Sequence, residues 1–408
     1  MSFILCKIKF TGNAGLNKKI IVILFLTKVF AGIFNGWLSH YYPHADTWLY
    51  HNEALTEYHL LFKDPKEYFT NLFISNYGDN YSGLFKSTHS YWNDLKTNLM
   101  VKFISVMDIF SGGNYYINVI LYNFICFFGN MALFKVFSSI YKGQHKILAA
   151  GCFLLPSFLY FGSSIHKEGL IIACLGIVIY GMYTGLRARY FKIKKLIYIS
   201  AALIFIFLLR NYIFIALLPP LLAWIICARS RFHPLFVFLA VYIIGVMIFF
   251  SISKLTPQLN LPAAIVDKQQ AFLALEKANS GITLKPLTAD FLSFLSNAPE
   301  ALINSLFRPF ITDGQMLKFL YPLGLEILIY ELIFLMFLFY RKSKTESVHP
   351  FIYFGIFFSF SMLLIIGYIT PVLGAIVRYR SIYLPFLIIP MICSIKIPDF
   401  VGSKQIKK

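Results

Sequence analysis

Long apolar runs alternate with short polar stretches along almost the whole chain. Most runs come close to the roughly 20 residues that an α-helix needs to cross the hydrocarbon core of a bilayer. The pattern predicts an all-α fold, a polytopic helical membrane protein in which residues 1–408 form a single integral membrane domain. We expect about ten transmembrane helices, at residues 20–38, 115–140, 147–161, 169–186, 196–209, 212–228, 234–252, 317–340, 351–369 and 381–395.

The fifth expected span, residues 196–209, is shorter than a bilayer requires and is followed by Arg210 and Asn211. We expect it to form a tight hairpin with the span at 212–228, so that Arg210 sits below the level of the lipid headgroups. One continuous long helix is the alternative for this region.

Two polar segments are much longer than simple turns, residues 40–113 and residues 253–316. In the first segment, apolar side chains recur at helical spacing over residues 92–110, which predicts an amphipathic helix lying on the membrane. A surface helix packed on the protein is the alternative. The second segment is expected to contain an amphipathic helix near residues 271–278.

The composition supports the membrane class. The chain is 58% hydrophobic and 13% charged, whereas soluble domains carry about 25% charged residues. The net charge of +19 would suit a nucleic-acid partner, but the basic residues form short clusters between the apolar runs instead of one basic face. We therefore expect membrane lipids as partners and no nucleic acid.

The basic clusters also predict the orientation. Lys7, Lys9, Lys18 and Lys19 precede the first span and place the N-terminus in the cytoplasm by the positive-inside rule. Ten spans return the C-terminus to the same side, and both long polar segments then lie on the outer face. Every loop assigned to the cytoplasm is basic, and most acids fall on the outer side, which agrees with this assignment.

Neither the N-terminus nor the cysteines indicate a secreted, disulfide-bonded protein. The apolar run at 20–38 is too long for the core of a cleavable signal peptide, so we expect a retained span. None of the six cysteines lies in the two long polar segments. We expect no disulfide framework, no metal and no cofactor.

The polar residues just after the first span are candidates for catalysis. Asp46, Tyr50 and Glu53 lie at positions i, i+4 and i+7, which would put them on one face of a short helix, with His51 beside them. A carboxylate at a membrane surface next to His and Tyr can act as a general base. The alternative is a solvated loop in which Asp46 caps a helix.

The predicted topology brings several further charged residues to the outer face. A guanidinium can hold phosphate oxygens with two hydrogen bonds, so arginines and lysines at this face suit the binding of a lipid-linked phosphate. The expected phosphate-binding residues are Lys167, Arg210, Arg308, Arg378 and Arg380, with His166 and Glu168 in supporting positions.

Simpler roles remain open for most of these residues. Arg378 and Arg380 can extend to the headgroups, Lys167 and Glu168 can form a local ion pair, and Arg308 can be a surface loop residue. Arg210 is the strongest candidate, because an ionisable residue within a membrane is costly and usually functional.

Two carboxylates lie within the eighth expected span. Glu326 and Glu331 are five residues apart and point in different directions. At least one of them should face the bundle interior. Pairing with an arginine or a tyrosine hydroxyl is the structural alternative to a functional role.

Four short motifs resemble recurring features of the bacterial GT-C glycosyltransferases. Asp46, Tyr50 and Ala54 have the spacing Asp-x-x-x-Tyr-x-x-x-Ala, which is similar to the first-loop signature of that superfamily. The other three are Pro156 with Ser163-Ser164-Ile-His-Lys167-Glu168, Arg210-Asn-Tyr212 before a proline-containing span, and Arg378-Tyr379-Arg380 leading into Pro385. A first loop with helices lying on the membrane is also part of that architecture.

The resemblance implies a transferase of the bacterial cytoplasmic membrane, active on its outer face. Such enzymes move a sugar from a polyprenyl-phosphate donor to a lipid-linked or glycan acceptor, with the first-loop acid, here Asp46, as the base of an inverting single displacement. The second acid that usually adjoins the first is absent, since Ala45 precedes Asp46 and Thr47 follows it. This argues against a metal or two-acid site and leaves His51 or Glu53 as substitutes.

Two other classes of protein share parts of the pattern. O-antigen polymerases and ligases also have many spans, a large outer loop and essential arginines, and would rely on the Arg308 loop more than on Asp46. A transporter of lipids or polysaccharides would need polar residues along a path through the bilayer, whereas here they concentrate at one face.

Overall fold

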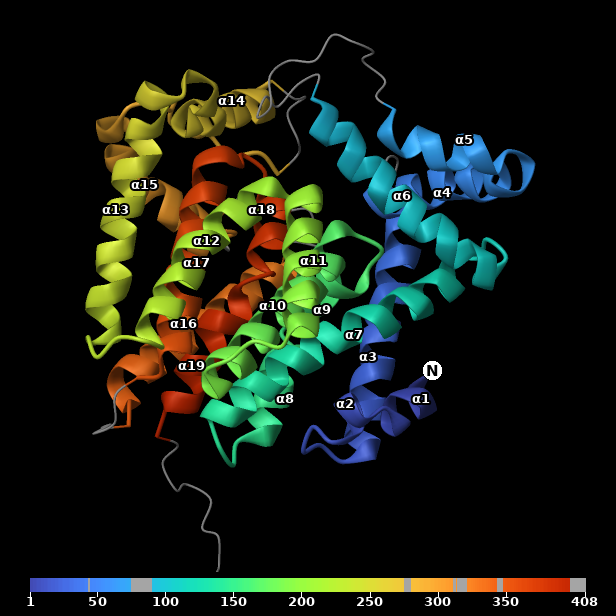
Figure 1. Cartoon of the computed structure of the whole chain (residues 1–408), viewed down its shortest axis with the longest axis horizontal. Helices are drawn as coiled ribbons and strands as arrows, with labels where there is room; N and C mark the ends of the chain where they lie inside the picture. Colours follow the sequence, from blue (N-terminus) through green and yellow to red (C-terminus); the bar gives the residue numbers. More distant parts are fainter. Residues whose placement is uncertain are drawn as a thin grey trace, which may run out of the picture.

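The computed structural model describes residues 1–42, 45–74, 90–274, 280–310, 313, 321–342 and 348–396. Over these residues the chain is helical, and the only β-type pairings are two isolated bridges, between Gly281 and Val372 and between Arg341 and Ile395. The all-α prediction is confirmed. The long apolar helices form one bundle (Figure 1).

Six of the described helices are long and apolar enough to cross a bilayer, which supports a multi-pass membrane protein. They match the first, second, fourth, seventh, eighth and ninth expected spans. Their bounds are α3 (Lys18–Ser39), α7 (Tyr115–Ile140), α10 (Lys167–Ala188), α13 (Pro234–Leu255), α16 (Tyr321–Tyr340) and α17 (Pro350–Ile369).

The expected span at 147–161 is broken into two helices, and the helix within the expected span at 381–395 is preceded by another helix at a sharp angle. α8 (His145–Phe153) meets α9 (Pro156–Ser163) at 52°, and α18 (Leu373–Arg380) meets α19 (Leu384–Ser394) at 63°. Each second helix begins with a proline in its first turn, and proline has no N–H to continue a preceding helix. Counting each bent pair as one span gives up to eight spans, so the expected number of ten is not confirmed.

The break in the second pair corrects one expectation. Arg378 and Arg380 were expected in a short turn, but they lie in the last turn of helix α18. The sequence Leu373–Arg380 has low overall hydrophobicity and reads as a turn, yet its backbone is helical, and hydrogen bonds attach the residues at its start to the second long polar segment. Ile282 N–H donates to Pro371 O at 2.7 Å, and Leu373 N–H donates to Ser280 O at 3.0 Å.

The region around Arg210 forms two helices. α11 (Ile193–Leu209) and α12 (Asn211–Cys227) are separated by Arg210, whose φ of −152° and ψ of 89° are outside the helical region. The alternative of one continuous helix is therefore wrong. Phe207 and Phe214 pack across the break with ring centroids 5.4 Å apart.

Both long polar segments contain helices. The first holds α4 (Asp46–Lys63), α5 (Pro65–Thr70), the 3-10 turn η1 (Asn71–Phe73) and α6 (Tyr91–Ser111), which confirms the helix expected at 92–110. The second holds the 3-10 turn η2 (Pro257–Leu259), α14 (Leu261–Leu273) and α15 (Phe291–Leu306).

The helix expected near 271–278 was placed too late in the sequence. α14 ends at Leu273, and residues 275–279 lie outside the described part of the chain. Asn260 and Pro262 start the helix earlier, because the Asn260 side chain accepts from Ala263 N–H at 3.0 Å. α15 was not expected from the sequence.

The helices of the two segments gather at one end of the bundle. Figure 1 shows α4, α5 and α6 at the same end as α14, whereas α1 (Ser2–Lys7) and α2 (Lys9–Gly12) lie toward the opposite end. The expectation that both segments share one side of the protein is thus consistent with the fold.

Small residues bring the central helices close together. A Cβ atom at Gly129 of α7 would lie 2.3 Å from Ala173 Cα of α10, and one at Gly176 would lie 2.3 Å from Gly129 O. Such close approach is typical of helix pairs in membranes, where tight packing has to replace the hydrophobic effect. By contrast, most of α13 and α16 is apolar and exposed, as expected for helices that contact lipid.

Candidate functional site

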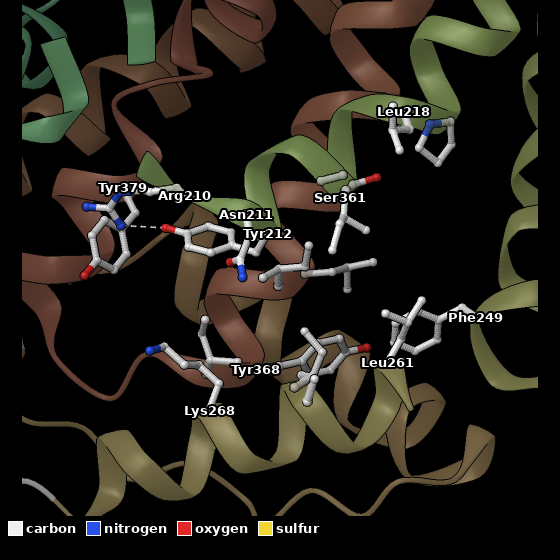
Figure 2. A pocket seen from close by; sticks show the side chains of 18 of the residues that line it. Arg210, Asn211, Tyr212, Leu218, Phe249, Leu261, Lys268, Ser361, Tyr368 and Tyr379 are labelled. Carbon is white, nitrogen blue, oxygen red and sulfur yellow. Dashed lines mark hydrogen bonds between the residues drawn. The ribbon is translucent and has the colours of Figure 1, made fainter. Parts of the chain in front are cut away.

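A cavity of about 1250 Å³ opens between α12, α13, α14, α15 and α17 and reaches the first turns of α4 and α10. Most of its wall is apolar, with side chains such as Leu218, Phe249 and Leu261 (Figure 2). The charged residues concentrate at one end, where the residues from α4, α10 and α18 meet. The cavity therefore offers a long apolar space with one charged end.

An ion-pair network lies at the charged end. The Arg378 guanidinium donates to Asp46 Oδ2 at 2.6 Å and lies with its Nε 3.4 Å from Glu168 Oε1. Arg210 donates to the same Glu168 oxygen. Asp46, Glu168, Arg210 and Arg378, which come from four separate parts of the sequence, thus lie together.

The two carboxylates differ in accessibility. The side chain of Asp46 is 41% exposed and that of Glu168 is 1% exposed. Each belongs to the first turn of its helix, α4 or α10, where the partial positive charge of the helix N-terminus favours a carboxylate. A substrate can reach Asp46, whereas the buried Glu168 is a counterion of both arginines.

Tyrosines complete the network. Arg210 Nη1 donates to the Tyr212 hydroxyl oxygen at 2.6 Å, as Figure 2 shows, and its guanidinium lies 4.3 Å from the centroid of the Tyr379 ring. The Arg378 guanidinium lies 5.3 Å from the same ring. Both cations thus lie within reach of a cation–π contact with Tyr379.

Asp46 is held in place by the residues that follow it. Thr47 forms a 2.6 Å hydrogen bond with the Tyr115 hydroxyl, and Trp48 Nε1 donates to Gly36 O at 2.8 Å. The Trp48 and Tyr115 rings stack at 4.2 Å. These contacts attach the start of α4 to α3 and α7 and fix the position of its first turn.

The surrounding charges keep Asp46 ionised. Burial alone would raise the pKa of the Asp46 carboxyl, but the positive charges of Arg378 and Lys167 lower it below its ordinary value, Arg378 most strongly. Burial, reinforced by Arg378, lowers the pKa of His166 to about 4. At neutral pH the site therefore presents an Asp46 carboxylate beside a neutral His166.

The other candidates on α4 have different surroundings. Tyr50 lines the cavity and lies under the Lys167 ammonium, which is 5.1 Å from its ring centroid. Glu53 is outside the residues that line the cavity, and burial raises the pKa of its carboxyl against the opposing effect of Lys167. His51 packs against the Trp48 and Tyr115 rings, and burial lowers its pKa.

Two of the predicted arginines lie away from the cavity. The buried Arg380 donates to the backbone oxygens of Ser305, Leu306 and Arg308 at 3.0, 3.0 and 2.8 Å. It therefore satisfies carbonyls that the end of α15 leaves without helical partners. Arg308 itself pairs with Asp313 at 3.0 Å.

Glu326 is also separate from the cavity. Its Oε1 accepts from Ser157 N at 2.9 Å, from Ser157 Oγ at 3.0 Å and from the Tyr330 hydroxyl. Pairing of a buried glutamate with a tyrosine hydroxyl was the structural alternative considered from the sequence. That pairing lies within α16, and the hydrogen bonds with Ser157 connect α16 to the first turn of α9.

Two lysines of the cavity were missed by the sequence analysis. Lys96 of α6 and Lys268 of α14 both line it, one from each long polar segment. Figure 2 shows the Lys268 ammonium directed toward the end that holds Arg210 and Tyr379. A single lysine on an amphipathic helix is ordinary, so only the tertiary structure distinguishes these two.

The electrostatics of Lys96 reflect its neighbours. Burial, reinforced by Lys167, Lys268 and Arg210 and opposed by Asp94, lowers the pKa of the Lys96 ammonium to about 6. Clustered cations in a half-buried site are typical of places that bind an anion.

Among the described residues, no group of His, Cys, Asp and Glu side chains is arranged to hold a metal ion. The arrangement offers the accessible Asp46 carboxylate, several cationic side chains and a large apolar space. Comparisons with protein-family models, curated proteins and solved structures found no match to this chain.

Proposed function

We propose that the protein is a membrane glycosyltransferase that moves a sugar from a polyprenyl-phosphate-linked donor to a lipid-linked or glycan acceptor. The observation that carries this proposal is the accessible Asp46 carboxylate, held beside Arg378 at the charged end of a large apolar cavity. The apolar wall suits an isoprenoid chain, and the charged end suits its phosphate. The site would act on the outer face of a bacterial cytoplasmic membrane, with both termini in the cytoplasm.

The reaction is a single displacement with inversion at the anomeric carbon. Asp46 takes the proton of an acceptor hydroxyl, whose oxygen forms a bond to the anomeric carbon. The bond from that carbon to the donor phosphate oxygen breaks, and the lipid phosphate leaves with the electron pair. Because the leaving group is anionic, nearby cations stabilise its developing charge.

Arg378 connects the two halves of this mechanism. It pairs with Asp46 and lies beside Glu168, which also holds Arg210. A bound phosphate would compete with Asp46 for the Arg378 guanidinium. Asp46 would then lose the partner that lowers its pKa and become a stronger base when the donor is present.

The positions of the other candidates favour this proposal over a polymerase or ligase built on the Arg308 loop. Arg308 is paired with Asp313 and is not among the residues that line the cavity. Asp46 does line it, together with Lys167, Arg210 and Arg378.

Replacement of Asp46 by Asn tests the proposal. General-base catalysis contributes about 10²–10⁴-fold, so Asp46→Asn should lower the single-turnover rate of sugar transfer at least about a hundredfold, with little loss of donor binding. The assay uses purified protein and a polyprenyl-linked sugar donor. Glu300→Gln, which removes a carboxylate that pairs with the exposed Lys285, is the matched control. A near wild-type rate for Asp46→Asn would exclude Asp46 as the base.

A further inference from the structure

The two arginines of the site are already neutralised by carboxylates. Arg210 pairs with Glu168, and Arg378 pairs with Asp46 while its Nε lies 3.4 Å from Glu168. Two guanidinium groups and two carboxylates cancel in formal charge. The arginines can orient a phosphate, but together with their partners they do not offset its charge.

The remaining basic side chains of the cavity are three lysines, Lys96, Lys167 and Lys268. They come from α6, from the first turn of α10 and from α14, and all line the cavity. Among the residues that the structure describes, none of the three ammonium groups forms an ion pair. Lys96 donates to the Asn93 side chain, and Lys167 and Lys268 lie 5.1 and 5.4 Å from the ring centroids of Tyr50 and Phe272.

The three lysines are close enough to act on one another. Lys167 and Lys268 both lower the pKa of Lys96. Burial lowers the pKa of Lys268, and Arg210 lowers it further. Bringing like charges into a half-buried site costs free energy unless an anion offsets them. Their convergence from segments far apart in sequence is therefore expected where an anion binds.

The position of Lys268 is built into the fold. The neighbouring Gln269 is buried and donates from Nε2 to Tyr368 O at 2.7 Å and to Lys285 O at 3.1 Å. Leu287 N–H donates to Gln269 Oε1 at 2.9 Å. These bonds attach α14 to α17, so Lys268 faces the cavity from an anchored helix.

The charge of the whole cavity indicates the class of anion. Its described lining holds five cationic side chains, the three lysines with Arg210 and Arg378, and two carboxylates, Asp46 and Glu168. The formal charge is therefore +3 when all the lysines are protonated. A phosphate diester brings one negative charge to such a site, whereas a diphosphate diester brings two.

We propose that Lys96, Lys167 and Lys268 bind the diphosphate group of an isoprenoid diphosphate ester, whose chain occupies the apolar part of the cavity. This inference rests on the proposed function and specifies its donor as a sugar linked to lipid through a diphosphate. The lysines then hold the headgroup from both long polar segments. In the transfer step the leaving group is the lipid diphosphate.

Binding of two probes to the full-length protein in detergent tests the inference. Farnesyl diphosphate and farnesyl phosphate share one chain and differ by a single phosphate group. Isothermal titration should give an affinity at least about tenfold higher for the diphosphate, since one further charge contact in a half-buried site exceeds the 1.4 kcal/mol that a factor of ten requires. Equal affinities would overturn the inference.

Variants connect that preference with the lysines. Lys96→Gln and Lys268→Gln should each reduce the preference for diphosphate at least threefold, and the double variant should abolish it. Lys96→Arg keeps the positive charge and should retain the preference for diphosphate. This variant also serves as a control for correct folding of the site. Lys285→Gln, in which the lost lysine is 69% exposed and pairs with Glu300, is the matched control. A preference that survives in the double variant would also overturn the inference.

The two proposals fail in different ways. If sugar transfer depends on Asp46 but the probes bind equally, the glycosyltransferase proposal stands and the diphosphate site is wrong. If the lysine variants lose the preference but Asp46→Asn transfers sugar normally, the diphosphate site stands and the assignment of the base is wrong.

Discussion

We expect the negative charge of Glu168 to contribute strongly to the stability of the protein. The Glu168 side chain is 1% exposed and is the shared partner of Arg210 and Arg378. Glu168→Gln keeps the size of the side chain and removes the charge, so both guanidinium groups lose a buried counterion. At an effective dielectric constant of about 20, the 3.4 Å contact with Arg378 is worth about 5 kcal/mol of Coulomb energy. Breaking a buried pair costs about 3–5 kcal/mol.

We therefore expect Glu168→Gln to lower the free energy of unfolding by about 3–5 kcal/mol. The measurement is reversible unfolding in detergent micelles, followed by far-ultraviolet circular dichroism. The control is Glu300→Gln, because the ion pair of Glu300 with Lys285 is largely solvent-exposed and should contribute less than about 1 kcal/mol.

A double-mutant cycle separates the charge effect from a packing effect. Arg210→Gln in the Glu168→Gln background removes one of the stranded cations, so the double variant should be more stable than the sum of the two single changes by about 1–3 kcal/mol. Additive losses would refute the account of Glu168 as a shared counterion. So would a Glu168→Gln variant as stable as the wild type.

Two further predictions concern Lys96 and the orientation of the protein. Because Lys96 has a pKa of about 6 among Lys167, Lys268, Arg210 and Asp94, a bound anion should raise that pKa. Its contribution to diphosphate affinity should be complete below pH 6 and should weaken as the pH rises above 6. The pH dependence of farnesyl diphosphate binding, measured by titration, should flatten in Lys96→Gln, and identical profiles would contradict this. Reporters fused near residue 260 and near residue 344 should lie outside and inside the cytoplasmic membrane, respectively, and the opposite pattern would place the site on the cytoplasmic side.

The longest apolar helices could be read from the sequence, whereas α15 and α18 could not. α7 begins and ends where the apolar run at 115–140 predicts, because a bilayer sets the length of an apolar helix and backbone groups within it must be satisfied internally. The breaks in the bundle were harder to predict. Pro156 lies inside an apolar run, and hydropathy alone does not say whether a proline bends a span or starts a new helix.

The charged site was only partly predictable. Its four central residues belong to polar stretches that the predicted topology brings to one side, so Asp46, Glu168, Arg210 and Arg378 were all among the candidates. Which of them pair was not predictable, since Asp46 and Arg378 are 332 residues apart. Arg380 was expected beside Arg378, but two residues along a helix point in different directions, and Arg380 instead binds the end of α15.

What the sequence by itself determined is the class of the protein, an all-α protein with several membrane-spanning helices, because hydropathy and helix length act locally along the chain. The tertiary structure alone decided which charges neutralise one another and which do not. Lys96 and Lys268 look like ordinary lysines of surface helices, and they belong to the cavity only because α6 and α14 pack at the same end of the bundle. Electrostatic energy depends on distance in space, and distance in space is not encoded in any local pattern of residues.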